Sequence, residues 1–223
     1  MRLFLDNFAN LDSFLQIYPL LLQGLQLTVL LSLIALPTAA ALGLVVAVVY
    51  GMAGRLSRIF LICYMDFFRS FPVLVLLVLV FYGLPFIGIT LGNLTAVVLA
   101  LVLNNSGYFG EIFRAGIESI PREQRETATA LGLKPLHIMF LIILPQAIRK
   151  VMAPLATNSL ELVKTTSIAS LVAVPELLRS ARVAQEQTYN PTPLIAAAAI
   201  FFVLLLPLAR LVARLERKMM MEH

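Results

Sequence analysis

The chain contains 223 residues, of which 60% are hydrophobic and 13% are charged, and its net charge is +5. Soluble domains carry about 25% charged residues, so this composition excludes an ordinary soluble protein and indicates helices that face lipid or one another. The basic excess does not indicate a nucleic-acid partner, because in a membrane protein the positions of Lys and Arg matter more than their sum. The single cysteine, Cys63, excludes an internal disulfide, and neither His137 nor His223 has neighbours that suggest a metal site or a catalytic base.

Two long stretches contain no charged residue, one between Asp12 and Arg55 and the other between Arg69 and Glu111. Each is longer than the roughly 20 residues that cross a bilayer as a helix. Glycine and proline residues within 83–92 indicate a tight connection that divides the second stretch. The expected fold is therefore an all-α integral membrane protein with one membrane domain over residues 1–223. Its five expected transmembrane helices lie near residues 22–50, 58–84, 92–113, 147–172 and 193–212.

The basic residues predict the orientation of these helices. Five spans place the two termini on opposite sides of the membrane. If the C-terminus is cytoplasmic, twelve of the 17 Lys and Arg residues lie on the cytoplasmic side, as the positive-inside rule requires. The twelve are Arg55, Arg58, Arg114, Arg122, Arg125, Lys134, Arg149, Lys150, Arg210, Arg214, Arg217 and Lys218. The N-terminus is therefore expected outside and the C-terminus inside.

Five helices rarely enclose a polar path by themselves. A second copy of the chain or a homologous partner is therefore expected beside it in the lipid, as a homodimer or a heterodimer.

Residues 118–146 form the one long polar insertion and are expected on the cytoplasmic side. A short helix should begin after Pro121, since proline is favoured at the first helical position, and should stop at Gly132, since glycine is favoured just after the last. Composition alone favours an amphipathic helix at the membrane surface. The alternative is a coupling helix that docks in a groove of a separate protein and transmits its movement to the spans.

The spacing within this insertion resembles a known signature. Permease subunits of bacterial binding-protein-dependent ABC importers carry Glu-Ala-Ala, three residues, Gly, nine residues and Ile-x-Leu-Pro. The chain has Glu126-Thr127-Ala128, then Gly132, then Ile142-Ile143-Leu144-Pro145, so only the first Ala is replaced. The resemblance implies a type I importer fold and a role in ATPase coupling. The residues to which it assigns that role are Glu126, Ala128, Gly132, Leu133 and Pro145.

Three further segments resemble the polar amino acid uptake group of these permeases: residues 64–72, 111–117 and 164–168. The resemblance implies translocation of polar amino acids or similar small polar solutes across the bacterial inner membrane. It also implies two kinds of partner, an ATPase inside and an extracytoplasmic solute-binding protein outside. The chain has no Gly-x-x-x-x-Gly-Lys-Ser/Thr stretch for holding ATP, so ATP is expected on the partner ATPase and no cofactor or enzymatic activity on this chain.

Polar side chains also fall near the middle of the membrane. At about 1.5 Å per helical residue, Arg69, Asn104 and Glu161 each lie roughly 15–16 Å from the basic residue at the cytoplasmic end of their span. With Thr165 and Ser167, they are the candidate substrate-binding residues, because a zwitterion needs a cation, an anion and hydrogen-bonding groups. The alternative is internal pairing, of Arg69 with Asp66 and of Glu161 with Lys164, which are both i,i+3 pairs.

Two other functions are weaker hypotheses. A secondary transporter or channel is disfavoured by the small number of helices, the lack of an internal repeat and the coupling signature. A membrane enzyme would need convergent nucleophile, base or metal-binding groups, and the sequence suggests none.

Overall fold

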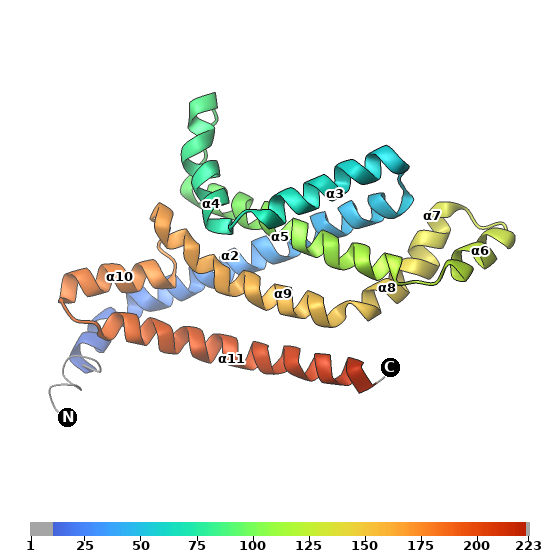
Figure 1. Ribbon diagram of the computed structural model, residues 1–223. Coiled ribbons are helices and arrows are strands. Elements are labelled where there is room, and N and C mark those ends of the chain that lie inside the picture. Colours follow the sequence, from blue (N-terminus) through green and yellow to red (C-terminus); the bar gives the residue numbers. More distant parts are fainter. Residues whose placement is uncertain (1–10, 222–223) are drawn as a thin grey trace.

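The computed structural model describes residues 11–221, and each regular element in that range is a helix (Figure 1). The predicted all-α membrane fold is confirmed. Within residues 11–221, three helices are long and apolar enough to cross a membrane, and the number of spans is five if each of two bent pairs of helices counts as one span. Residues 1–10 and 222–223 of the predicted single domain lie outside the described part.

Helix α2 (Leu11–Met52) has 42 residues, which corresponds to about 63 Å at 1.5 Å per residue. It continues without a break through Pro19 and Pro37 and packs along α5 (Asn93–Glu118), whose residues are mostly buried. At the crossing, a Cβ atom on Gly43 would lie 2.7 Å from the Cβ of Phe109 and 2.7 Å from the backbone nitrogen of Gly110. Glycine is therefore needed at this position for the two backbones to approach so closely.

The predicted second span, residues 58–84, is not one straight helix. It consists of α3 (Arg55–Ser70) and a second arm at 97° to it. Pro72 favours the break, because proline disfavours the helical region for the residue before it, and Phe71 has φ −84° and ψ 130°. The second arm is formed by α4 (Val73–Val78), the π-helical η1 (Leu79–Gly83) and the 3₁₀-helical η2 (Leu84–Ile87).

The second arm projects away from the other helices (Figure 1). It ends at Gly88, which has φ +84°. This left-handed residue lies within the connection that the glycine and proline residues predict, and α5 begins soon after it.

The chain between α5 and the predicted fourth span is more helical than expected. After α6 (Arg122–Ala130), a helical path runs through α7 (Pro135–His137), the π-helical η3 (Ile138–Ile143) and α8 (Leu144–Lys150). It bends by 64° near Val151 and continues as α9 (Met152–Thr165) and the 3₁₀-helical η4 (Thr166–Val172). The helical part of the fourth span thus begins at Pro135 and not near residue 147. The charged residues Arg149 and Lys150 lie at the bend within this span and not at its start.

Helix α10 (Leu177–Thr188) is an element that the span predictions do not contain. It packs on α2 and on α11 (Thr192–Met221). The fully buried Glu176 is its N-cap, and its carboxylate accepts hydrogen bonds from the backbone N–H groups of Leu178 at 2.9 Å and Arg179 at 2.8 Å. Burial raises the pKa of Glu176. The backbone N–H of Leu177 donates to the hydroxyl of Thr28 at 3.1 Å, which fixes α10 to α2.

The two ends of the molecule differ in their elements. Helix α6 and the last turn of α11 lie at one end, and the first turn of α2 lies at the other, close to α10 (Figure 1). This arrangement agrees with the predicted orientation, in which the coupling helix and the C-terminus share the cytoplasmic side.

The crossing of α2 and α5 supplies a test of the packing. Gly43→Val should lower the melting temperature of the purified protein, since overpacking of this kind costs about 1–3 kcal/mol. Gly54→Val is the matched control, because a Cβ atom at Gly54 meets nothing within 4 Å. Equal melting temperatures for the two variants would contradict the close approach at Gly43.

Candidate functional site

Helix α6 has the start and end that the sequence predicts, within one residue. Pro121 is its N-cap, so the helix begins at Arg122, one position later than a proline at the first helical position would give. At the other end, Gly132 has φ +79°. The N–H of Leu133 donates to the carbonyl of Ala128 at 3.1 Å, and the N–H of Gly132 donates to the carbonyl of Thr129 at 2.9 Å. These two bonds form a Schellman motif, which requires a residue that tolerates positive φ.

The predicted coupling residues occupy different faces of this segment. Ala128 is 2% exposed and packs with η3, and Leu133 is partly buried against the same core. Glu126 is exposed. Pro145 lies in the first turn of α8, directly after the π-helical turn η3. Since proline has no N–H to donate, the α-helical hydrogen-bond pattern cannot pass through Pro145 unchanged.

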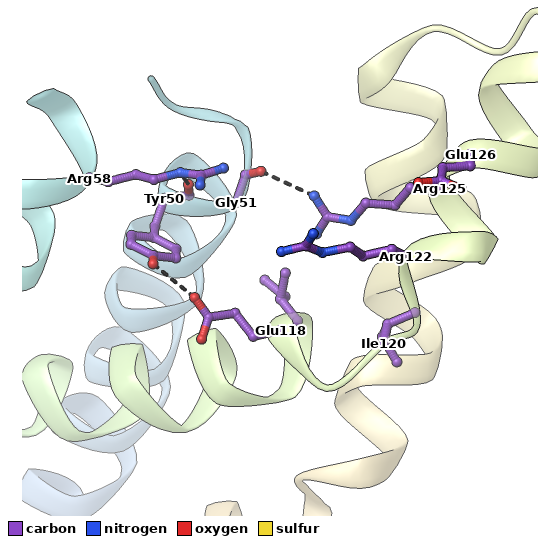
Figure 2. A pocket seen from close by; sticks show the side chains of 9 residues that line it. Tyr50, Gly51, Arg58, Glu118, Ile120, Arg122, Arg125 and Glu126 are labelled. Carbon is purple, nitrogen blue, oxygen red and sulfur yellow. Dashed lines mark hydrogen bonds between the residues drawn. The ribbon is translucent and has the colours of Figure 1, made fainter. Parts of the chain in front are cut away.

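A cavity of about 550 Å³ lies between α6 and the ends of α2, α3 and α5 (Figure 2). Beside it, the hydroxyl of Tyr50 donates to one carboxylate oxygen of Glu118 at 2.8 Å, and Arg114 donates to the other at 2.7 Å. The guanidinium groups of Arg58 and Arg114 lie 5.4 and 5.5 Å from the centre of the Tyr50 ring. The cytoplasmic ends of three helices are thereby joined around Tyr50.

Asn104 stabilises the bend between α3 and the second arm. Its side chain is 6% exposed, and its amide nitrogen donates to the carbonyl of Phe68 at 2.8 Å and to that of Phe71 at 3.0 Å. Phe68 lies in the last turn of α3 and Phe71 is the C-cap residue, so no helical N–H follows to pair with either carbonyl. The two amide protons are therefore used by the backbone, and only the Oδ1 atom of Asn104 can accept a further hydrogen bond.

Arg69 lies next to this bend and faces acidic groups on two helices. It is 3.7 Å from Asp66 on its own helix, which confirms the predicted i,i+3 pair, and 3.6 Å from Glu111 on α5. With Tyr108 and Glu111 it lines a cavity of about 360 Å³. The hydroxyl of Tyr108 also donates to the carbonyl of Arg69 at 3.3 Å.

The residues of α5 in this cavity are missing from the predicted substrate-binding set. Tyr108, Glu111 and Ile112 follow an i, i+3, i+4 spacing that places them on one helical face. The sequence could predict that these three residues share a helical face. It could not predict their contact with Arg69, because that contact depends on how α3 packs on α5.

The other candidates gather on α9 and η4. The amino group of Lys164 lies 2.6 Å from the Glu161 carboxylate, which confirms the second predicted pair. The hydroxyls of Thr165 and Ser167 donate to the carbonyls of Glu161 and Lys164, so each of them is left with acceptor capacity. One turn before Glu161, the buried side-chain nitrogen of Asn158 has no hydrogen-bond partner within residues 11–221.

The structure thus divides the five predicted substrate-binding residues into two groups. Arg69 and Asn104 belong to the α3–α5 contact, and Glu161, Thr165 and Ser167 belong to α9–η4. Within the described part of the chain, no ion pair or hydrogen bond joins Glu161 to Arg69 or to Asn104.

Sequence comparisons find relatives over most of the chain. Residues 39–221 match the family model described as binding-protein-dependent transport system inner membrane component. The chain is 31% identical over 198 residues to the probable amino-acid ABC transporter permease protein YckA of Bacillus subtilis, with 86% of this chain and 85% of that protein covered. It is 32% identical over 207 residues to the arginine transport system permease protein ArtQ of the same species, with 90% and 93% covered.

Solved structures share the fold. A chain of a crystal structure of an amino acid ABC transporter with histidines is 33% identical, with a TM-score of 0.82 and with 92% of this chain and 97% of that chain covered. A chain of the MetNI methionine ABC transporter in an inward-facing conformation is 20% identical, with a TM-score of 0.73 and 90% and 96% covered. The second similarity supports the fold alone.

The bend at Asn104 can be tested by removing its amide. Asn104→Leu leaves two part-buried carbonyls without a donor, so the free energy of unfolding should fall by about 1 kcal/mol per carbonyl, measured as a lower melting temperature in detergent. Asn105→Leu is the matched control, because the amide of Asn105 donates to the carbonyl of Leu101 within its own helix. An equal loss of stability in both variants would show that the bend does not depend on Asn104.

Proposed function

The chain belongs to the family of binding-protein-dependent transport system inner membrane components, and from that premise we propose that its cargo is a polar amino acid. It is a multi-pass permease subunit of an ABC importer with the type I fold, which works with a separate ATPase and a solute-binding protein. Relatives that are named for arginine or glutamine transport support the proposed cargo class. The observation that carries the proposal is the cavity in which Arg69 faces Glu111.

A zwitterionic cargo needs opposite charges a short distance apart. In this proposal the guanidinium group of Arg69 binds the carboxylate of the amino acid, since its planar donors suit carboxylate geometry. Glu111 on the facing helix binds the ammonium group through the acceptor capacity that remains on its two oxygens, which accept hydrogen bonds from Arg114 at 2.8 and 2.6 Å. The Asp66 and Glu111 carboxylates lie more than 3.5 Å from Arg69, which leaves the donors of Arg69 without short hydrogen bonds to these acids.

Glu161, Thr165 and Ser167 form a second proposed contact for the cargo. Glu161 is exposed and offers a negative charge on α9, beside the unpaired amide nitrogen of Asn158. The hydroxyl oxygens of Thr165 and Ser167 can accept hydrogen bonds from an ammonium group. Asn104 contributes its free Oδ1 and, by holding the bend, the position of Arg69.

Coupling to the ATPase is proposed to occur through α6. Among its side chains, Glu123, Gln124 and Glu126 are exposed and open to a partner protein. Its inner face carries Ala128, which is packed on η3. Because η3 continues through α8 into α9, a displacement of α6 is transmitted to the helix that carries Glu161.

The remaining partners follow from the same proposal. The ATPase supplies the bound ATP, so the permease needs no cofactor of its own. A second permease chain, identical or homologous, completes the translocation path, and the solute-binding protein delivers the amino acid from outside.

The coupling role predicts a specific sensitivity at Gly132. A β-branched residue at φ +79° costs on the order of 1–2 kcal/mol, so Gly132→Val should displace the end of α6 and reduce both ATP-driven uptake and cargo-stimulated ATPase activity. Expression should be unchanged, because a Cβ atom at Gly132 meets nothing within 4 Å. Gly132→Asn is the control and should retain uptake, since asparagine adopts the left-handed conformation. Normal uptake by Gly132→Val would remove the support for the coupling role.

The proposed contact at Glu161 can be separated from simple pairing with Lys164. Glu161→Gln keeps the side-chain shape and removes the charge, so the affinity for an amino acid should fall about ten- to a hundredfold through loss of a charge-assisted hydrogen bond. The measurements are cargo-dependent ATPase activity and cargo uptake by the assembled transporter. If the double variant Glu161→Gln/Lys164→Met regains normal uptake, the role of Glu161 is confined to its pair with Lys164.

A further inference from the structure

The cavity between α6 and the membrane helices carries positive charge that the protein itself does not neutralise. Arg58 reaches it from α3, and Arg122 and Arg125 reach it from α6 (Figure 2). Among residues 11–221, none of these three guanidinium groups lies within 4.0 Å of a carboxylate. Arg58 donates to the carbonyl of Tyr50 at 3.2 Å, and Arg125 lies 3.5 Å from the carbonyl of Gly51.

The carboxylates beside the cavity do not balance these cations. Both oxygens of Glu118 already accept hydrogen bonds, one from Tyr50 and the other from Arg114. Glu126 is the remaining acidic residue of the lining. Partial burial, and then the nearby charge of Arg58, lower the pKa of Arg125, as expected where cations are held together without enough anions.

The position of the cavity indicates where an anion would come from. Arg58 lies in the first turn of α3, where the chain enters the membrane after the end of α2. The same helix exposes Leu56, Ile59 and Phe60, which lie together on the face of α3 turned away from Arg58 and form an apolar surface suited to acyl chains at this level. Phosphate headgroups lie at this level of the bilayer, and basic pockets at the cytoplasmic ends of spans suit anionic lipids.

We propose that this cavity binds the phosphate of an anionic phospholipid from the cytoplasmic leaflet, with Arg58, Arg122 and Arg125 as its ligands. Arginine forks bind phosphate oxygens in pairs, and a volume of about 550 Å³ admits a headgroup. A lipid in this place bridges α6 to the corner between α2 and α3. It therefore sets how firmly the proposed coupling helix is attached to the membrane helices.

The test measures lipid binding and needs no transport activity, so its outcome is independent of the proposed cargo and coupling roles. Purified full-length permease in neutral detergent is titrated with short-chain phosphatidylglycerol, with phosphatidylcholine of the same chain length, and with inorganic phosphate. The readouts are the shift in melting temperature and the number of bound lipids by native mass spectrometry. Wild type should bind phosphatidylglycerol, and phosphatidylcholine should bind more weakly.

The decisive variants change charge on the two sides of the cavity. Arg122→Gln/Arg125→Gln should weaken phosphatidylglycerol binding about tenfold or more, whereas Glu126→Gln should strengthen it. Arg210→Gln/Arg214→Gln is the matched control, because it removes two exposed arginines from the cytoplasmic half of α11 and should bind as wild type does. If the α6 double variant does not fold, Arg58→Gln tests the same cavity from α3.

Several outcomes would overturn the proposal. Unchanged lipid affinity in the α6 variant would exclude the cavity as the site, and equal losses in the α6 and α11 variants would indicate general attraction to basic residues. An equal stabilisation by inorganic phosphate would assign the cavity to a free anion. If the partner ATPase displaces phosphatidylglycerol and an acidic side chain of the ATPase takes its place, the cavity is assigned to the contact with the ATPase.

Discussion

The constraint on which the structure most depends is that a membrane helix cannot break without new partners for its freed backbone groups. In lipid there is no water to accept or donate the missing hydrogen bonds. The turn at Phe71 and Pro72 is possible because the amide of Asn104 donates to two carbonyls at the end of α3. That pair of bonds allows the chain to turn by 97°. It also places Arg69 at the opening between α3 and α5, where Glu111 and Tyr108 face it.

The same constraint explains which parts of the fold could be predicted from the sequence. Apolar runs and the distribution of basic residues predict five spans and their orientation, since both depend on composition along the chain. The break at Pro72 could not be predicted in this way, because Pro37 lies in an equally apolar run and leaves α2 continuous. The difference between the two prolines lies in a side chain far along the sequence. Helix α10 was missed for a related reason, since its attachment depends on the cap at Glu176 and the bond to Thr28.

At the candidate sites, local features were predictable and contacts between helices were not. The pairs Asp66–Arg69 and Glu161–Lys164 follow from i,i+3 spacing, and the end of α6 follows from a glycine at the right distance after Pro121. The approach of Glu111 to Arg69 follows only from the packing of α3 on α5. Asn104 was expected to face the cargo, and the structure adds a backbone role that occupies both of its donors.

The length of α2 has a mechanical consequence. Its apolar part, Phe14–Met52, has 39 residues and is about 58 Å long at 1.5 Å per residue, whereas the hydrocarbon layer is about 30 Å thick. A rod of this length cannot stand upright without exposing apolar turns to water, but at a tilt of about 40° it spans roughly 44 Å, the thickness of a bilayer with its headgroups. Because Gly43 holds α2 to α5 at close range, any tilt that α2 takes in the bilayer is shared by α5.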